Sequence, residues 1–553
     1  MLKLWGMRIV RVWVQIAAAV ASGLLVAGLF APFDQSWLVW VAMLPLLWAL
    51  GAVRGKRVGW KGFGIGYVAG LASGLVQLQW LGTVSWLGVV LLSLYLAIYW
   101  GLFGAFASSF RTPHSALRSS FCQAAVWAGL EWLRGWLFTG FGWNGLGVAF
   151  HDMPAMAQGA DLLGVTGLSL MVIFIQALVL QVVVRREKWR VGWDLGIAAA
   201  LVAGWYGYGK WRIASEGQAE SVRLKTLLVQ INIPQDAARM LWTDLQIHQA
   251  YEDETVKALD GLKAADGSLS AQWPDWVMWP ECALTGRILR TNDGEWGTWQ
   301  INQDTLAQVR VAGPFSLIYG VNELEAEKSG EELVPKSEGR AYNSIAVMSP
   351  EDELQTYRKR HLVIFGETIP FVDSLPWLKK IYEQQAGVEF GGSFTPGDSL
   401  EPLPIMAGAT QLGAIPTICF EDTVGRLTRK FLRPGPQVII NVTNDGWFKE
   451  SAAAAQHFAN ARFRAIELRR PMLRCANSGV SAAIDSTGAA QTLVDARGSH
   501  FTRGSLLTDL KIPLRPSATL FGLIGDWGIL FLAAIGVGVA VLTRKSGSAI
   551  TGN

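Results

Sequence analysis

Long apolar stretches separated by short polar connections dominate the first 215 residues. A helix of about 20 apolar residues crosses a bilayer core about 30 Å thick. The pattern predicts seven such helices before the polar part of the chain and one after it, at 13–31, 36–53, 62–82, 85–109, 119–138, 162–184, 192–209 and 519–542. The first stretch follows basic residues, as a signal peptide does, but its length and the helices behind it favour an uncleaved span.

Residues 216 to about 515 follow a different pattern, in which extended segments rich in β-branched and aromatic residues alternate with helical ones. We expect strands at 224–233, 275–281, 315–323, 341–350, 412–422, 438–445 and 480–488, and helices at 241–264, 299–311 and 453–470. This order predicts a layered α/β or α+β domain. The expected organisation is a seven-helix transmembrane domain (1–215), the layered domain (216–515), an eighth transmembrane helix (516–545) and a flexible cytoplasmic tail (546–553).

Composition agrees with a membrane protein. Hydrophobic residues make up 51% of the chain and charged residues 17%, whereas soluble domains carry about 25% charged residues. Residues 1–215 contain six of the 44 acidic residues and 17 of the 26 tryptophans, and tryptophan is enriched at membrane interfaces. The net charge of +4 is too small to indicate a nucleic-acid partner.

Basic residues occur in every second connection between the predicted spans. The connections at 31–36, 82–85 and 139–161 contain no Lys or Arg, whereas the others and both chain ends do; Lys210 and Arg212 are the exception. Because Lys and Arg favour the cytoplasmic side, we expect both termini in the cytoplasm. Seven crossings then place the 216–515 domain on the periplasmic face of a bacterial inner membrane.

Neither a metal nor an organic cofactor is expected. None of the six histidines stands in an H-x-x-x-H arrangement, which a dedicated zinc site commonly uses. The chain also lacks a glycine-rich phosphate loop. The four cysteines are too scattered for a disulfide framework.

Three segments contain residues suited to catalysis. Cys419 ends an apolar strand in IPTICFED, and a thiolate is a good nucleophile when a base and a positive charge support it. Glu281 ends another strand in WPECALTG, where its neighbours Trp279 and Pro280 would desolvate a general base. YRKRHLVIFGETIP (357–370) offers a lysine for an oxyanion. Taken singly, each has an ordinary interpretation as a core cysteine, a turn carboxylate or a solvated basic run.

The order W-P-E, Y-x-K-x-H-L-V and I-C-F-E resembles the nitrilase superfamily of carbon–nitrogen hydrolases. The resemblance implies an αββα sandwich with a catalytic triad of Glu281, Lys359 and Cys419. Together with the membrane segments, the whole chain resembles the apolipoprotein N-acyltransferases. The segments that carry this second resemblance are EWLRGWLFTGFGW, VQINIPQ, RKRHLVIFGE, NDGWF and RRPMLRCANSG.

That family resemblance implies an activity. An acyl chain would pass from a membrane phospholipid, through a cysteine thioester, to the α-amino group of the diacylglyceryl-cysteine that begins a lipoprotein, and a monomer would suffice. The residues implied to surround the triad are Glu367, Phe420, Glu421, Asn444 and Trp447. The chain departs from the family pattern at Ile364, commonly Pro, and at Phe420, commonly Tyr. Phe420 must therefore act through packing or its backbone N–H.

Two other function classes fit parts of the sequence. A tethered amidase of the nitrilase type would need only one anchoring helix, and the eight predicted spans argue against it. A transporter would place functional charges deep in several spans, and few are found there. Segment 373–387 mixes aromatic and aliphatic residues with two lysines, which is typical of an interfacial amphipathic element or of a core-packed helix.

The predicted topology can be checked by labelling single introduced cysteines in intact spheroplasts. We expect a membrane-impermeant thiol reagent to label Asp34→Cys and Gln218→Cys from outside, because both positions lie on the periplasmic side. Arg57→Cys and Ser546→Cys should be labelled only after lysis. Labelling of Arg57→Cys in intact spheroplasts would show that the topology is inverted and that the 216–515 domain lies in the cytoplasm.

Overall fold

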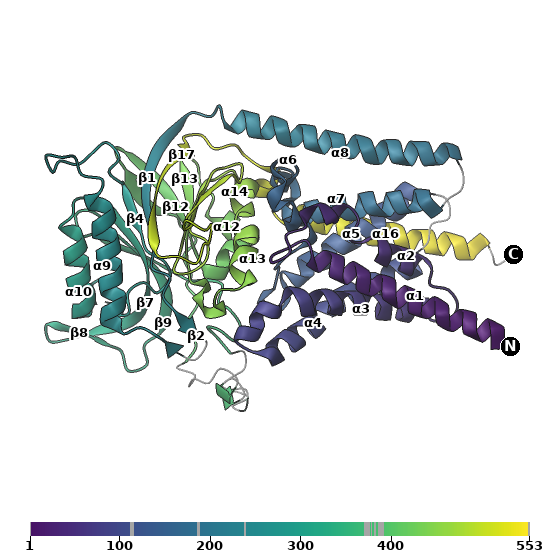
Figure 1. Ribbon diagram of the computed structural model, residues 1–553, viewed down its shortest axis with the longest axis horizontal. Helices are drawn as coiled ribbons and strands as arrows, with labels where there is room; N and C mark the ends of the chain where they lie inside the picture. Colours follow the sequence, from purple (N-terminus) through teal and green to yellow (C-terminus); the bar gives the residue numbers. More distant parts are fainter. Residues whose placement is uncertain are drawn as a thin grey trace. The chain divides into compact units, whose positions relative to one another are not determined.

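The computed structural model describes residues 2–110, 115–184, 188–236, 239–369 and 392–550, with a few single positions from 377 to 384. Most of segment 373–387 lies outside the described residues. The chain divides into two compact units, Met1–Ser215 with Ala518–Asn553, and Glu216–Ser517. The first unit is helical and the second is built from sheets and helices (Figure 1).

The helical unit contains the predicted apolar segments as helices. The longer ones are α1 (Leu2–Ala27), α2 (Leu44–Gly51), α3 (Val58–Gln77), α4 (Trp86–Ser109), α5 (Ala116–Arg134), α7 (Ala160–Val184), α8 (Lys188–Glu216) and α16 (Trp527–Ile550). Among the described residues, three stretches are long and apolar enough to cross a membrane: Val10–Ala27, Trp86–Ser109 and Ala160–Gln181. Ser36–Gly51 and Trp527–Thr543 are shorter apolar stretches. The count of eight crossings and their orientation stay predictions.

Small residues allow α3 and α4 to pack at very short range. Glycines recur every four residues along α3, at Gly62, Gly66, Gly70 and Gly74. A Cβ atom on Gly66 would lie 2.2 Å from the carbonyl oxygen of Trp100, and one on Gly104 would lie 2.2 Å from that of Gly62. Such stripes are typical of helix pairs in membranes, where close backbone contact replaces the hydrophobic driving force.

Helix α8 extends past the expected end at residue 209 and buries a charge. Arg212 Nε lies 2.8 Å from Asp161 Oδ2, and the Tyr208 hydroxyl donates to Asp161 Oδ1 at 2.8 Å. Arg212 is one of the two basic residues that do not follow the alternation of loop charges. Its charge is neutralised by a carboxylate at the start of α7, because a buried charge is costly unless it is paired.

The second unit contains two large sheets in its described part. The first has the strand order β10-β9-β7-β4-β1-β17 and the second β11-β12-β13-β14-β15-β16. The bounds in the first are β1 (Ser221–Gln230), β4 (Trp276–Met278), β7 (Ser316–Ser329), β9 (Ala341–Met348), β10 (Leu354–Arg358) and β17 (Gly504–Pro513). Those in the second are β11 (Leu403–Ala407), β12 (Thr410–Ile418), β13 (Gln437–Thr443), β14 (Met472–Ala476), β15 (Ala482–Ile484) and β16 (Ala490–Thr492).

Helices cover the outer faces of the paired sheets (Figure 1). Helices α9 (Asp244–Asp260) and α10 (Gln300–Arg310) lie on the first sheet, and α12 (Gly425–Thr428), α13 (Ala452–Ala461) and α14 (Phe463–Leu468) lie on the second. Strand β1 contacts β14 of the other sheet, and β7 contacts β13. The expected αββα sandwich, in a chain that also has a helical region with apolar spans, is confirmed.

Strand directions bring the ends of several strands to common edges. Strands β1, β4 and β7 are parallel, and β10 runs with them because β9 is antiparallel to both β7 and β10. Strands β12, β13 and β14 are parallel as well. The carboxyl ends of β4 and β10 therefore share one edge of the first sheet, and those of β12 and β13 share one edge of the second.

Candidate active site

Glu281 follows the short buried strand β4. Three residues after Met278, the chain turns against β7, where Gly320 accommodates it: a Cβ on Gly320 would lie 2.5 Å from the Glu281 Cα. The Glu281 side chain is only 7% exposed. The carboxylate is thus fixed by backbone packing on a strand rather than by a mobile surface turn.

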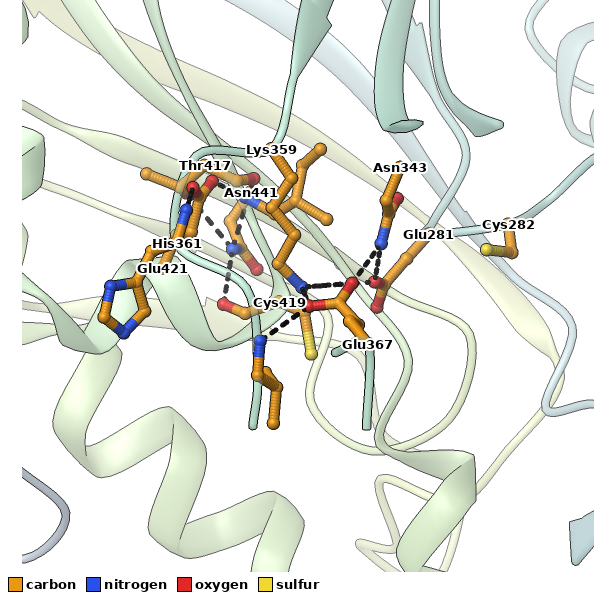
Figure 2. A network of polar contacts seen from close by, with 12 residues as sticks. Glu281, Cys282, Asn343, Lys359, His361, Glu367, Thr417, Cys419, Glu421 and Asn441 are labelled. Carbon is orange, nitrogen blue, oxygen red and sulfur yellow. Dashed lines mark hydrogen bonds and ion pairs between the residues drawn. The ribbon is translucent and has the colours of Figure 1, made fainter. Parts of the chain in front are cut away.

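Lys359 immediately follows β10 and is 1% exposed. Its ammonium Nζ lies 2.9 Å from each carboxylate oxygen of Glu367 and 3.7 Å from Glu281 Oε1. The Asn343 amide donates to both carboxylates, at 2.8 Å each. Figure 2 shows these four side chains converging beside the Cys419 sulfur. The arrangement holds one cation between two buried anions.

Burial and pairing shift the pKa values of these groups. Burial alone lowers the pKa of Lys359, but the carboxylates of Glu367 and Glu281 more than offset this, so its pKa lies above the usual range. Burial raises the pKa of Glu367, but the Lys359 charge outweighs it and the net shift is downward. Burial raises the pKa of Glu281, and Lys359 only partly opposes it. Glu281 therefore has the higher proton affinity of the two carboxylates, as suits a general base.

Cys419 begins the short turn η5 (Cys419–Thr423) directly after β12, and its φ is +51°. A non-glycine residue in this region is uncommon and is often found at functional turns. The Glu281 carboxylate and the Lys359 ammonium lie beside the thiol (Figure 2). Burial raises the pKa of the thiol well above its usual range, and the Glu281 charge adds to this. The thiol is therefore protonated at rest and needs a base during attack.

Glu421 lies behind the nucleophile and is fully buried. Its Oε1 accepts from the backbone N–H groups of Arg360 and His361, each at 2.8 Å, and its Oε2 accepts from that of Ile418 at 2.9 Å. The Tyr357 hydroxyl donates to it as well. Burial raises its pKa to about 7, against the effect of Lys359 and these donors. Glu421 ties the Lys359 segment to the turn of Cys419.

The remaining predicted residues lie around this centre with different contacts. The ring of Phe420 stacks on His361 at 5.9 Å; burial lowers the pKa of His361 to about 4, so that ring is neutral. Asn444 Oδ1 accepts from the Gly446 N–H at 3.1 Å and thereby begins the turn η7 (Asp445–Phe448). Trp447, in the same turn, is 46% exposed. Phe420 thus lies in the nucleophile's turn and stacks on His361, and Trp447 exposes aromatic surface on η7.

Several residues of the site escaped the sequence analysis. Asn343 bridges the two carboxylates, and Asn441 Nδ2 donates to the Cys419 carbonyl at 3.3 Å. Behind the turn lies a buried cluster of Asp422, Asp445, His457 and Arg474. The carboxylates and Arg474 lie inside the family-like segments, but His457 stands in an alanine-rich helix that carries no such signal.

The other cysteines have different surroundings. Cys282, beside Glu281, places its Sγ 3.9 Å from Asn322 Oδ1, and it lies beyond Glu281 from Cys419 in Figure 2. Cys475 is fully buried, with its Sγ near backbone carbonyls of β1 and β4. Cys122 belongs to α5 of the helical unit. Among the residues that the structure describes, no group of three or more His, Cys, Asp or Glu is placed to hold a metal ion.

The geometry suits nucleophilic acyl substitution. A thiol next to a carboxylate of raised pKa can lose its proton as it attacks a carbonyl carbon. An adjacent lysine that stays charged can stabilise the negative oxygen of the tetrahedral intermediate. Both requirements are met within one cluster, in which Glu281 and Lys359 are buried and Cys419 is partly exposed.

Comparisons with known proteins agree with this architecture. Residues 22–178 match the family model of the apolipoprotein N-acyltransferase N-terminal domain, and residues 228–513 match that of the carbon–nitrogen hydrolases. The apolipoprotein N-acyltransferase of Bradyrhizobium diazoefficiens is 30% identical over 98% of this chain and 96% of its own length. That of Geobacter metallireducens is 30% identical over 85% of both chains. That of Photobacterium profundum is 27% identical over 96% of both.

Gly320→Ala should displace the backbone of Glu281 while leaving every side chain of the cluster chemically unchanged. The added methyl meets backbone atoms of residues 280–282 at 2.5–2.7 Å, so the turn must shift. We expect iodoacetamide to alkylate Cys419 at least about tenfold more slowly, since a positioned general base contributes about 10²–10⁴-fold. Gly297→Ala is the matched control, because its methyl would lie 3.4 Å from the nearest atom. Equal alkylation rates in both variants, read by peptide mass spectrometry, would contradict this role of Gly320.

Proposed function

The chain belongs to the apolipoprotein N-acyltransferase family, and on that premise we propose that it transfers an acyl chain from a membrane phospholipid to the N-terminus of lipoproteins through a thioester on Cys419. The protein is an acyltransferase of a bacterial membrane, and its substrates are lipids and lipoproteins. The observation that carries the proposal is the cluster in which Lys359 lies 3.7 Å from Glu281 and both side chains converge beside the Cys419 sulfur (Figure 2).

In the first step, Glu281 takes the thiol proton while the sulfur of Cys419 attacks an ester carbonyl of the phospholipid. Lys359 and the backbone N–H of Phe420 hold the resulting oxyanion. The tetrahedral intermediate collapses, the carbon–oxygen bond breaks, and Glu281 returns the proton to the departing lysophospholipid. The acyl chain remains on Cys419 as a thioester. A single donor in such a site is worth about 2.7–4 kcal/mol.

In the second step, the α-amino group of a diacylglyceryl-cysteine attacks the thioester carbonyl. Glu281 accepts the proton that the amine loses, and the same donors hold the second oxyanion. The carbon–sulfur bond breaks, and the thiolate of Cys419 recovers its proton from Glu281. The acyl chain arrives as an ester and leaves as a more stable amide, so the reaction requires no nucleotide.

Glu367 and Glu421 act on this chemistry through other residues. Glu367 pairs with Lys359 at 2.9 Å and keeps the ammonium charged and oriented. Glu421 accepts backbone N–H groups on both sides of the site and fixes the separation between Lys359 and the nucleophile. Asn444 and Trp447 shape the neighbouring turn, where the exposed ring of Trp447 suits contact with an acyl chain.

Both proposed substrates carry acyl groups, which accounts for the apolar helical part of the protein. We propose that the protein lies in the bacterial inner membrane with both termini in the cytoplasm and residues 216–515 on the periplasmic side, and that it acts as a monomer. Phospholipid and immature lipoprotein then reach the site without leaving the bilayer. An amidase that acts on small soluble amides would not need helices packed through small residues, as α3 and α4 are.

Cys419→Ser should abolish both the thioester and the maturation of lipoproteins. A hydroxyl is a much weaker nucleophile than a thiol here, since no strong base is available to ionise it. Purified protein mixed with phospholipid is examined by mass spectrometry for an acyl adduct on Cys419. In parallel, the N-terminal peptides of lipoproteins from cells carrying either protein are analysed for the third acyl chain.

Cys282→Ala is the matched control for this experiment, because Cys282 adjoins the base but contacts Asn322. It should retain the adduct and the mature lipoproteins. An adduct that persists in Cys419→Ser and disappears in Cys282→Ala would overturn the assignment of the nucleophile. Turnover of small amides by the wild-type protein, without any lipid adduct, would favour an amidase instead.

Glu421→Gln should slow thioester formation rather than the transfer of the acyl chain. The substituted amide places an NH₂ group against one or more backbone N–H donors, and an unsatisfied buried donor costs about 1–3 kcal/mol. Single-turnover measurements separate the two steps. Thioester that forms at the wild-type rate and then accumulates would show that Glu421 serves the incoming amine.

Glu367→Gln, which weakens the pairing of Lys359, should slow both steps because the oxyanion occurs in each.

A further inference from the structure

A closed cluster of four buried charged residues lies behind the turn that carries Cys419. The two ring nitrogens of His457 contact different carboxylates, with Nε2 2.8 Å from Asp422 Oδ1 and Nδ1 2.7 Å from Asp445 Oδ1. Arg474 binds the other oxygen of each carboxylate, at 3.3 Å to Asp422 and 3.2 Å to Asp445. Each of the four side chains is at most 4% exposed. The mechanism above makes no use of this cluster.

The cluster joins the two turns that flank the nucleophile. Asp422 lies in the turn η5, three residues after Cys419, and Asp445 begins the turn η7, which contains Trp447. His457 belongs to helix α13 and Arg474 to strand β14, whose backbones are fixed by the second sheet and its covering helix. Through the cluster, a helix and a strand hold both turns in a fixed relation.

The charges balance in only one protonation state of His457. Two carboxylates and one guanidinium leave one negative charge, which an imidazolium cancels. A neutral imidazole has a single N–H, so it can donate to one carboxylate only and would face the other with a lone pair. Burial lowers the pKa of His457, but the Asp422 and Asp445 charges outweigh this and raise it to about 9. The contacts and the charge balance both require the protonated ring at neutral pH.

One more charged residue contacts the turn η5. Arg464 of α14 pairs with Glu467 at 2.8 Å and donates to the Thr423 carbonyl at the end of η5. On the side of the nucleophile, the charge of Asp445 acts on the Cys419 thiol and raises its pKa. The protonation state of His457 is therefore transmitted to Cys419 both through the geometry of η5 and through the charge of Asp445.

We propose that His457 is a positioning residue for the reaction at Cys419, whose imidazolium clamps Asp422 and Asp445 and thereby holds the nucleophile's turn and the turn of Trp447 in their active arrangement. The inference rests on the proposed function of Cys419. It assigns a role to residues outside the triad and its immediate partners. His457 touches neither substrate nor reacting atoms and acts through the two carboxylates.

A dependence on alkaline pH follows from this role. Because the folded pKa of His457, about 9, lies above the ordinary value of about 6.5, the clamp is complete at and below neutral pH. It is lost as the pH rises through about 9. Lys359 does not titrate in the same interval, because its pKa is raised above its ordinary value, which is already higher than 9.

The experiment measures single-turnover thioester formation by the full-length protein in phospholipid micelles between pH 6.5 and 10. In the wild type, the rate should fall above about pH 9. In His457→Gln it should be at least about tenfold lower at pH 7.5, the equivalent of one unit in the pKa of the thiol, and should show no fall near pH 9. In Asp445→Asn the fall should move to lower pH, because one of the two carboxylates that stabilise the imidazolium is gone.

His248→Gln is the matched control. His248 is as buried as His457, but its ring nitrogens contact the hydroxyls of Thr305 and Thr285 instead of carboxylates. This variant should retain the wild-type fall above pH 9. A fall that stays at the wild-type position in both His457→Gln and Asp445→Asn would overturn the proposal, even if both variants are less stable.

Alkylation of Cys419 by iodoacetamide at pH 7.5, read by peptide mass spectrometry, separates this inference from the proposed function. His457→Gln should slow alkylation by about tenfold, and His248→Gln should not. If the wild-type protein forms no thioester with phospholipid but the alkylation rates differ as expected, the proposed function fails and the positioning role stands. Equal alkylation rates together with normal thioester formation would refute the positioning role alone.

Discussion

The ion pairing of Lys359 with two buried carboxylates is the interaction on which the site depends. A lysine that is 1% exposed remains charged only because Glu367 and Glu281 compensate for its lost hydration. The same pairing separates the two carboxylates in proton affinity. Glu367, in closer contact with Lys359 than Glu281 is, stays ionised, while Glu281 retains the higher affinity that a base requires. The different distances of Glu367 and Glu281 from one cation thus give two chemically identical side chains different proton affinities.

The fold around this cluster must hold the strand ends of one sheet at a fixed distance from the strand ends of the other. Glu281 and Lys359 follow strands that end at one edge of the first sheet, and Cys419 follows a strand of the second. Nothing in a single sheet fixes the distance between these groups. Glu421 does so by accepting backbone N–H groups from the segments of both Lys359 and Cys419. The cluster around His457 instead joins two turns that follow strands of the second sheet.

The helical unit suits lipid substrates and has no part in the proposed chemistry. Its apolar helices and the glycine stripe of α3 suit a bilayer environment, where packing depends on close backbone approach. The proposed reaction uses residues of the α/β unit alone. In the proposed reaction the donor and the acceptor both carry acyl chains, so an enzyme within the bilayer would not have to extract either substrate into water.

The sequence by itself determined the division into a helical part and a layered α/β part, since hydrophobic periodicity is a property of short segments. Its local motifs carried the resemblance that implied the αββα class and the elements on which the proposed triad stands. It could not determine which polar residues meet. Asn343 reaches both carboxylates from a neighbouring strand, and His457 reaches Asp422 across 35 positions in sequence. The sequence also left open whether the Glu421 side chain faces the substrate or the backbone, because the motif I-C-F-E is the same in either orientation. Only the pairing of strands and the packing of the two sheets decided these contacts, since they join segments far apart in the chain.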